Sequence, residues 1–180
     1  LLDIDAAKEG RQIDLTTVSD IAKECFMPLT VGGGLRTCAD ISAALANGAD
    51  KVVVNTAFLE NPSFLREAVE TFGSQCIVVS LDIKQGDSGE YKLFSHSGVP
   101  NDLSLENAIE LCTSYRAGEL IVNDVTRDGA MTGYDLTLIS FVTQRTNIPV
   151  IVAGGAAGPD DCVAAINAGA SAAAAASMFH

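Results

Sequence analysis

Two glycine pairs, each with a hydroxyl residue at a fixed distance behind it, could hold the two ends of a phosphorylated ligand. Gly33 and Gly34 follow an apolar run, and Asn55 and Thr56 follow the next such run along the chain. The same arrangement returns 121 positions later, with the members Gly154, Gly155, Ala176 and Ser177. Glycine lets backbone amides approach an anion, and a hydroxyl can add a hydrogen bond. The spacing therefore predicts two phosphate-binding turns and a ligand with phosphates at both ends.

The repeat extends beyond these residues. Residues 28–40 align without a gap with residues 149–161, and Gly48 aligns with Gly169. A repeat of this length indicates one supersecondary unit used twice, because solenoid repeats have shorter periods of about 20–50 residues. Asp3 and Asp124 are also equivalent, and they could bind substrate hydroxyls or cap their own loops.

Asp82 is the sharpest candidate for acid–base chemistry. It follows an apolar run and precedes a polar stretch, so we expect it where a buried strand ends. A partly desolvated carboxylate there can act as a general acid or base, or it can bond its own loop amides. The repeat aligns Asp82 with a position ahead of Leu1, so we expect any twin carboxylate to lie outside this sequence.

Three further charged residues stand at the ends of predicted strands. Asp128 lies in a loop behind the apolar run 119–124 and is the second catalytic candidate, with a turn-forming Asp-Gly pair as the alternative. Lys51 and Glu119 begin their runs, so we expect them at the opposite, amino-terminal end of the strands. Charged residues at that end usually serve stability, for example as a salt-bridged ring.

Short β-branched runs alternate with amphipathic segments, which predicts an α/β protein. We expect strands at 1–4, 28–31, 51–55, 76–82, 119–124, 150–153 and 172–175. We expect helices at 14–24, 39–47, 62–72, 105–116, 136–145 and 160–168. Nearly continuous apolar runs indicate parallel strands buried on both faces. Both a doubly wound open sheet and a (β/α)8 barrel have such strands.

Polar residues at nearly every predicted strand end favour the barrel, because an open sheet would carry one glycine-rich turn at its switch point. We therefore predict a (β/α)8 TIM barrel with a half-barrel internal repeat, in which residues 1–180 form a single domain. A typical barrel has about 250 residues. We expect the first strand–helix unit and the last helix to be missing, and little activity without the first strand.

The composition excludes several classes of protein. A net charge of -12 argues against nucleic acid or membrane as a partner, although local backbone amides could still hold a phosphorylated substrate. No apolar run reaches the roughly 18 residues of a membrane span, and we expect no signal peptide. Five scattered cysteines without C-x-x-C spacing indicate free thiols and a cytoplasmic protein. The two histidines lack further ligands at suitable spacing, so neither a metal nor another cofactor is expected.

A series of short motifs spans the whole chain in order. They lie at residues 2–4, 31–34, 48–57, 60–62, 72–75, 82–84, 127–129, 133–135 and 176–180. Together they resemble the cyclase subunit of imidazole glycerol phosphate synthase, the HisF family of histidine biosynthesis.

The resemblance implies a lyase that closes an imidazole ring on a bisphosphorylated aminoimidazole carboxamide ribonucleotide. The ammonia would come from a glutaminase subunit in a heterodimeric glutamine amidotransferase complex. Asp82 would be the general acid and base, Asp128 would assist, and the partner aspartate of Asp82 is absent. Lys51 and Glu119 would belong to the ammonia entrance on the amino-terminal face.

The sequence also departs from that family. Asn123 and Asp124 stand where the histidine enzyme usually has threonine and serine, and Ala153 replaces a common serine. Residues 24–28 and 34–37 resemble paralogues that amidate sugars in surface-polysaccharide biosynthesis. Three functions stay open: the cyclase, the sugar-amidating paralogue, and a catalytically inactive phosphate-binding fragment.

Overall fold

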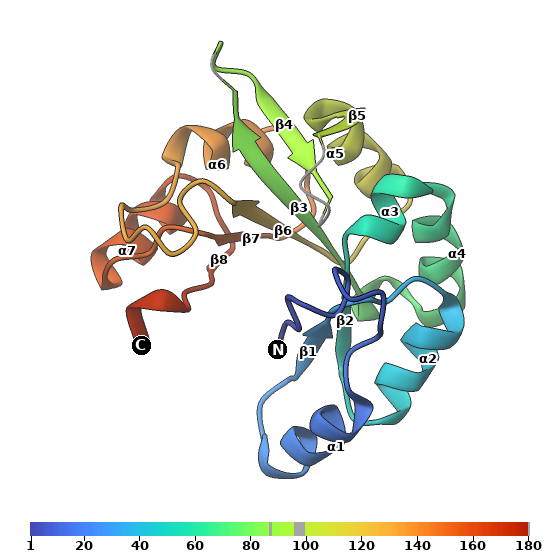
Figure 1. The fold of residues 1–180 in the computed structure, drawn as a ribbon. Coiled ribbons are helices and arrows are strands. Elements are labelled where there is room, and N and C mark those ends of the chain that lie inside the picture. Colours follow the sequence, from blue (N-terminus) through green and yellow to red (C-terminus); the bar gives the residue numbers. More distant parts are fainter. Residues whose placement is uncertain (87, 96–99, 180) are drawn as a thin grey trace. The chain divides into compact units, whose positions relative to one another are not determined.

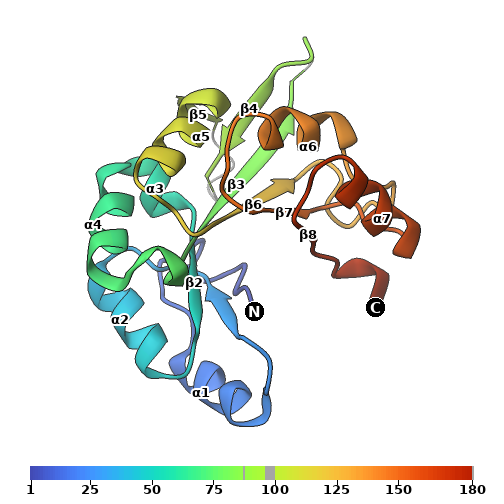
Figure 2. The ribbon, with the colours of Figure 1, turned by 180° about the vertical axis from the view of Figure 1, so that it is seen from behind.

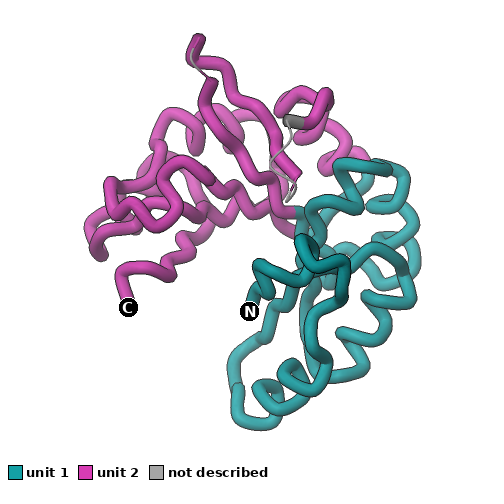
Figure 3. Tube along the Cα trace, viewed as in Figure 1, with its two compact units in different colours: residues 1–79, 115–118 teal, residues 80–114, 119–180 magenta. Residues whose placement is uncertain are grey.

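The computed structural model describes residues 1–86, 88–95 and 100–179. The chain forms two compact units (Figure 3). The first unit is Leu1–Val79 with Tyr115–Gly118, and the second unit is Ser80–Ser114 with Glu119–His180. Strands alternate with helices in both units, as predicted, and Figures 1 and 2 show the elements from opposite sides. That residues 1–180 form a single domain stays a prediction.

The first unit contains two short parallel strands, the start of a third, and the helices between them. Its elements are α1 (Leu15–Glu24), β1 (Thr30–Gly32), α2 (Cys38–Ala46), β2 (Lys51–Val54), α3 (Thr56–Glu60), α4 (Ser63–Phe72), the 3-10 helix η1 (Ser74–Cys76) and the first residues of β3 (Ile77–Gln85). α1 begins where it does because the Asp14 carboxylate accepts a hydrogen bond from the Thr16 amide, 2.9 Å away.

Parallel pairing and burial hold the first unit together. Thr30 of β1 lies opposite Lys51 of β2, and Val53 of β2 lies opposite Val78 of β3. The valines of β2 are almost completely buried, which suits a strand covered on both faces. α2 packs against β2 and α4 (Figure 1), and burial of a large side chain such as Phe58 contributes about 2 kcal/mol.

The second unit repeats this pattern and adds an antiparallel hairpin. Its elements are the rest of β3, β4 (Tyr91–Phe94), β5 (Pro100–Ser104), α5 (Leu105–Ser114), β6 (Glu119–Asp124), α6 (Leu136–Thr143), β7 (Val150–Ala153), α7 (Pro159–Asn167), β8 (Ala172–Ala173) and the 3-10 helix η2 (Ser177–Phe179). β6, β7 and β8 pair in parallel, with Leu120 opposite Val150 and Val152 opposite Ala173. α6 and α7 contact these strands (Figure 2).

The internal repeat is confirmed at the level of single hydrogen bonds. In both copies, an aspartate in the first turn of a helix accepts from two backbone amides just ahead of it. These bonds run from Arg36 and Thr37 to Asp40 in α2, and from Ala157 and Gly158 to Asp161 in α7. The N-cap aspartates of α1 and α6, Asp14 and Asp135, are equivalent in the same way. The two units therefore use the same local sequence signals for the same turns.

One predicted strand is almost absent. Residues 1–4 make only a single parallel bridge, between Leu2 and Gly32, and the prediction of a full strand there is wrong. Directly behind the bridge, the Asp3 carboxylate accepts from the Ala6 amide at 3.1 Å and stabilises the turn that follows.

The position of Asp82 within its strand also differs from the prediction. β3 does not end at Asp82 but continues to Gln85 and pairs antiparallel with β4, so that Asp82 lies opposite Phe94. The polar residues behind Asp82 belong to this hairpin, in which Ile83 and Leu93 are fully buried. The short helix α3, which starts directly behind Asn55, was also not predicted.

Candidate functional site

The first glycine turn, Gly33 and Gly34, has a conformation that only glycine tolerates well. Its φ angles are 129° and 65°. A Cβ at Gly33 would lie 2.6 Å from the backbone oxygen of Asp3, and a Cβ at Gly34 would overlap the backbone oxygen of Arg11. The turn therefore needs glycine both for its dihedral angles and for the space beside them.

Asn55 and Thr56 follow β2 at the same end of the sheet as this turn. β1 and β2 are parallel, with Gly32 opposite Val53, so the two segments leave neighbouring strands at their carboxyl ends. Both polar atoms of the Asn55 side chain are buried without a hydrogen-bond partner among the described residues. Such a group costs about 1–3 kcal/mol, which a bound polar ligand could offset. The unsatisfied amide of Asn55 marks this place as a candidate binding site.

The second glycine turn, Gly154 and Gly155, opens into a small hollow of the second unit. Their φ angles are 85° and 111°, and a Cβ at Gly154 would overlap the backbone oxygen of Asp124. Asp128 and Ser177 line the same hollow as these glycines. The sequence predicted Ser177 at this turn and Asp128 in a separate loop, and the structure places both the hydroxyl and the carboxylate beside the turn.

Asp3 and Asp124, the equivalent strand-end aspartates, bind their own loops. Asp3 accepts from the Ala6 amide and from the Arg11 guanidinium at 2.5 Å. The hydrogen bond from Arg11 is the main cause that holds the pKa of Asp3 below its usual value. Asp124 accepts from the Thr126 amide at 2.9 Å and lies 3.3 Å from the Arg127 guanidinium. These bonds favour the loop-capping alternative, and a substrate-binding role for Asp3 stays a prediction.

Asp82 is paired with an amide that was not among the predicted site residues. Nδ2 of Asn123, in β6, donates to Oδ1 of Asp82, in β3, at 3.0 Å. Both side chains are half-buried, and the two strands are neighbours in the sheet. The departure of Asn123 from the family pattern was the signal in the sequence that could have identified it.

Lys51 and Glu119 occupy the first positions of β2 and β6, as predicted. They therefore lie at the amino ends of their strands, whereas the glycine turns and Asn55 lie at carboxyl ends. A role of either residue in ammonia entry stays a prediction.

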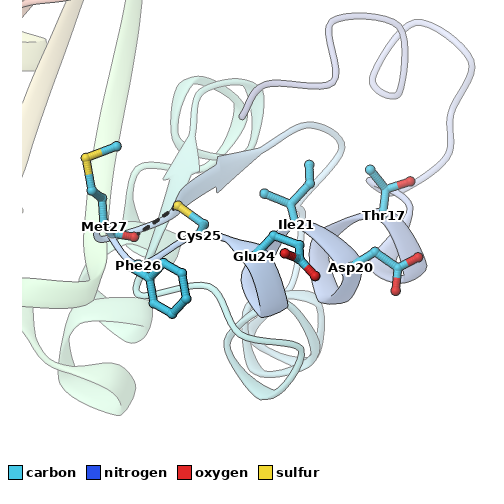
Figure 4. Close-up of a pocket in the computed structure, with 7 residues that line it drawn as sticks. All are labelled: Thr17, Asp20, Ile21, Glu24, Cys25, Phe26 and Met27. Carbon is cyan, nitrogen blue, oxygen red and sulfur yellow. Dashed lines mark hydrogen bonds between the residues drawn. The ribbon is translucent and has the colours of Figure 1, made fainter.

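A second hollow lies in the first unit, along α1 and the segment between α1 and β1 (Figure 4). Ile21, Cys25, Phe26 and Met27 form its apolar part. Phe26 is 100% exposed and Met27 is 75% exposed, which is unusual for large apolar side chains. Exposed apolar surface of this kind often marks a contact with another protein.

These features define the class of the protein, an α/β protein of the (β/α)8-barrel type with a half-barrel internal repeat. The family model described as "Histidine biosynthesis protein" matches residues 1–180, so the chain belongs to this family. This match confirms the resemblance to a family of histidine biosynthesis that the sequence motifs indicated. Among the described residues, no helix combines the length and the apolar character that crossing a membrane requires.

Two relatives match the whole chain. One, provisionally named imidazole glycerol phosphate synthase subunit hisF2, comes from Campylobacter jejuni; it is 44% identical, and the match covers 71% of its length. The other, imidazole glycerol phosphate synthase subunit HisF of Dictyoglomus turgidum, is 38% identical, and the match covers 72% of its length.

Proposed function

We propose that the chain is the cyclase of an imidazole glycerol phosphate synthase. The observation that carries this proposal is the pair of glycine turns, which recur with the same φ sign, the same backbone crowding and the same helix capping. Each turn would bind one phosphate of a bisphosphorylated aminoimidazole carboxamide ribonucleotide through backbone amides, which an acidic protein can also supply. The names of the two relatives support the same reaction.

Asp82 would act as the general acid and base of ring closure. It is half-buried and hydrogen-bonded in the second unit, the unit that also holds the second glycine turn. Asp128, which lines the hollow of that turn, would assist. A carboxylate in such surroundings can accept a proton from the attacking nitrogen and return it later in the reaction.

Ammonia would come from a glutaminase subunit that docks at the amino ends of the strands. Lys51 and Glu119 begin their strands there and would line the entrance. The exposed Phe26 and Met27 precede β1 at the same end of the first unit and would add apolar contact area. In the cell the two subunits would work as a cytoplasmic complex.

A second candidate is the amidation of a sugar by a paralogue of the cyclase. The observation that favours it is Asn123, which contacts Asp82 and replaces the threonine usual in the histidine enzyme. A different side chain beside the acid–base group would change which substrate, as the acceptor of ammonia, fits there.

Complementation separates the two candidates. We expect a full-length gene that encodes this chain together with a first strand to restore growth without histidine to a strain that lacks its own cyclase. The same gene with Asp82→Asn is the matched control and should fail. Growth failure of the unaltered gene, together with restored polysaccharide amidation in a strain that lacks the paralogue, would contradict the cyclase proposal and support the second candidate.

Ser177→Ala should weaken substrate binding more than turnover. Loss of one hydrogen bond to a charged phosphate costs about 1.5–3 kcal/mol, which corresponds to a KM roughly tenfold or more above normal. We expect kcat to change less than threefold in steady-state kinetics with ammonium salt. The control is Ser114→Ala, because that hydroxyl bonds the Leu111 carbonyl inside α5. An unchanged KM for Ser177→Ala would remove Ser177 from the phosphate site.

A further inference from the structure

We infer that Asn123 is a positioning residue for Asp82, an inference that rests on the proposed acid–base role of Asp82. The Asn123 amide donates to Oδ1 of Asp82 at 3.0 Å. An oxygen that accepts from an N–H donor is a poor place for a proton, so the pairing favours Oδ2 as the oxygen that carries the exchanged proton. The amide would thus fix both the direction of the carboxylate and its active oxygen.

The orientation of Asn123 is itself determined by its surroundings. Its backbone lies opposite Ala153 in the β6–β7 pairing. A Cβ at Gly154 would lie 3.0 Å from Oδ1 of Asn123, so the glycine turn leaves room for this side chain. With Oδ1 beside Gly154, Nδ2 is directed to Asp82. Asn123 therefore connects the second glycine turn with the acid–base candidate.

The internal repeat shows that the fold alone does not require an amide at this position. The residue equivalent to Asn123 is Leu2, which bridges Gly32 in the first unit as Asn123 pairs with Ala153 in the second. The side chain there is aliphatic, in a segment that forms this single bridge and no full strand. The polar side chain of Asn123 is thus explained by its contact with Asp82 rather than by strand pairing.

The charged groups on neighbouring strands stay the same in every variant proposed below. On β3 and β4 these are Lys84 and Lys92, which lie opposite each other toward the end of the hairpin. On β6 the next residue is Asp124, whose carboxylate is paired with Arg127. Differences between variants therefore report the change at Asn123 itself.

Two substitutions should change the pH profile in the same direction but by different amounts. Asn123→Ala removes the donor that stabilises the charged form of Asp82, so the acid limb of kcat/KM should move to higher pH, and kcat should fall about 10–100-fold. Asn123→Asp puts a second carboxylate beside Asp82. The acid limb should then move further, by more than one pH unit, because two close carboxylates cannot both ionise easily. KM should stay within threefold of the unaltered protein in both cases.

The experiment measures kcat and KM against pH with ammonium salt for the unaltered protein and the two variants. Asn107→Asp is the matched control, because it adds the same charge on the exposed surface of α5. Asn123→Ser, which keeps a short donor, should recover part of the lost kcat and shift the acid limb less than Asn123→Ala. If the aspartate variant does not fold, as judged by circular dichroism, the alanine and serine variants decide the question.

An NMR titration of the Asp82 carboxyl carbon separates this inference from the proposed function. If the unaltered protein lacks cyclase activity, the proposed function fails, but the titration midpoint of Asp82 should still rise in Asn123→Ala. An Asp82 titration that is the same in all variants would overturn the inference. An unchanged pH profile would also overturn it, even if kcat falls, because that is the result of a merely structural role.

Discussion

Asp82→Asn should lower kcat for ring closure about a thousandfold, because general acid–base groups contribute roughly 10²–10⁴-fold to rate. The amide has nearly the shape of the carboxylate and still offers an oxygen to the Asn123 donor, so β3 and its hairpin should keep their structure. KM should change less than threefold. The measurement is steady-state cyclisation with ammonium salt, which removes any dependence on the glutaminase subunit.

Asp128→Asn provides the comparison within the same unit. Asp128 lines the hollow of the second glycine turn, and as an assisting group its loss should cost less rate than the loss of Asp82. A variant Asp82→Asn that keeps more than a tenth of the normal kcat would refute the acid–base assignment. Equal losses in both variants would indicate that the two carboxylates act as one unit.

The repeat made much of the local structure predictable. The strands 119–124 and 150–153 and most helices fall within one or two residues of the prediction, because Gly48, Gly169 and the N-cap aspartates mark the same boundaries twice. The alignment of the two copies of the repeat also predicted the two glycine turns. The capping bonds that make them equivalent follow from the aligned aspartates Asp40 and Asp161.

The β3–β4 hairpin could not be predicted in this way, because it has no equivalent within the chain. The sequence predicts only a polar stretch behind Asp82, whereas polar and buried residues alternate there around Ile83 and Leu93. The partner of Asp82 was missed for a related reason. Asn123 reaches Asp82 across two strands that are 41 positions apart in the sequence, and no local pattern reports such a contact.

Asp3 and Asp124 show that a position at the end of a strand does not by itself reveal the role of a carboxylate. A carboxylate at a strand end is equally compatible with binding a ligand and with capping a loop. Only the bonds to the Ala6 and Thr126 amides, and to the two arginines, distinguish these uses. The two arginines are not equivalent in the repeat, since Arg11 follows its aspartate at a greater distance than Arg127 does. Both equivalent aspartates therefore form an ion pair with an arginine, although the two arginines come from non-equivalent positions.

Gly154→Ala should strongly destabilise the second glycine turn. The residue has a φ of 85°, which costs an alanine about 1–2 kcal/mol. The new Cβ would also overlap the Asp124 backbone oxygen and crowd Oδ1 of Asn123, so that backbone must move. We expect a total loss of about 3 kcal/mol or more in the free energy of unfolding, measured by urea denaturation followed by circular dichroism.

Gly89→Ala separates the two causes, because Gly89 has nearly the same φ, 87°, but no atom of the residues that the structure describes lies within 4 Å of its added Cβ. This variant should lose only the roughly 1–2 kcal/mol of dihedral strain. Equal losses at Gly154 and Gly89 would show that crowding by Asp124 contributes nothing. Gly33→Ala extends the argument to the other unit, where the added Cβ would crowd the Asp3 backbone oxygen. If the glycine turns are structural equivalents, Gly33→Ala and Gly154→Ala should cost the same to within about 1 kcal/mol, whereas a large difference would limit the equivalence to sequence.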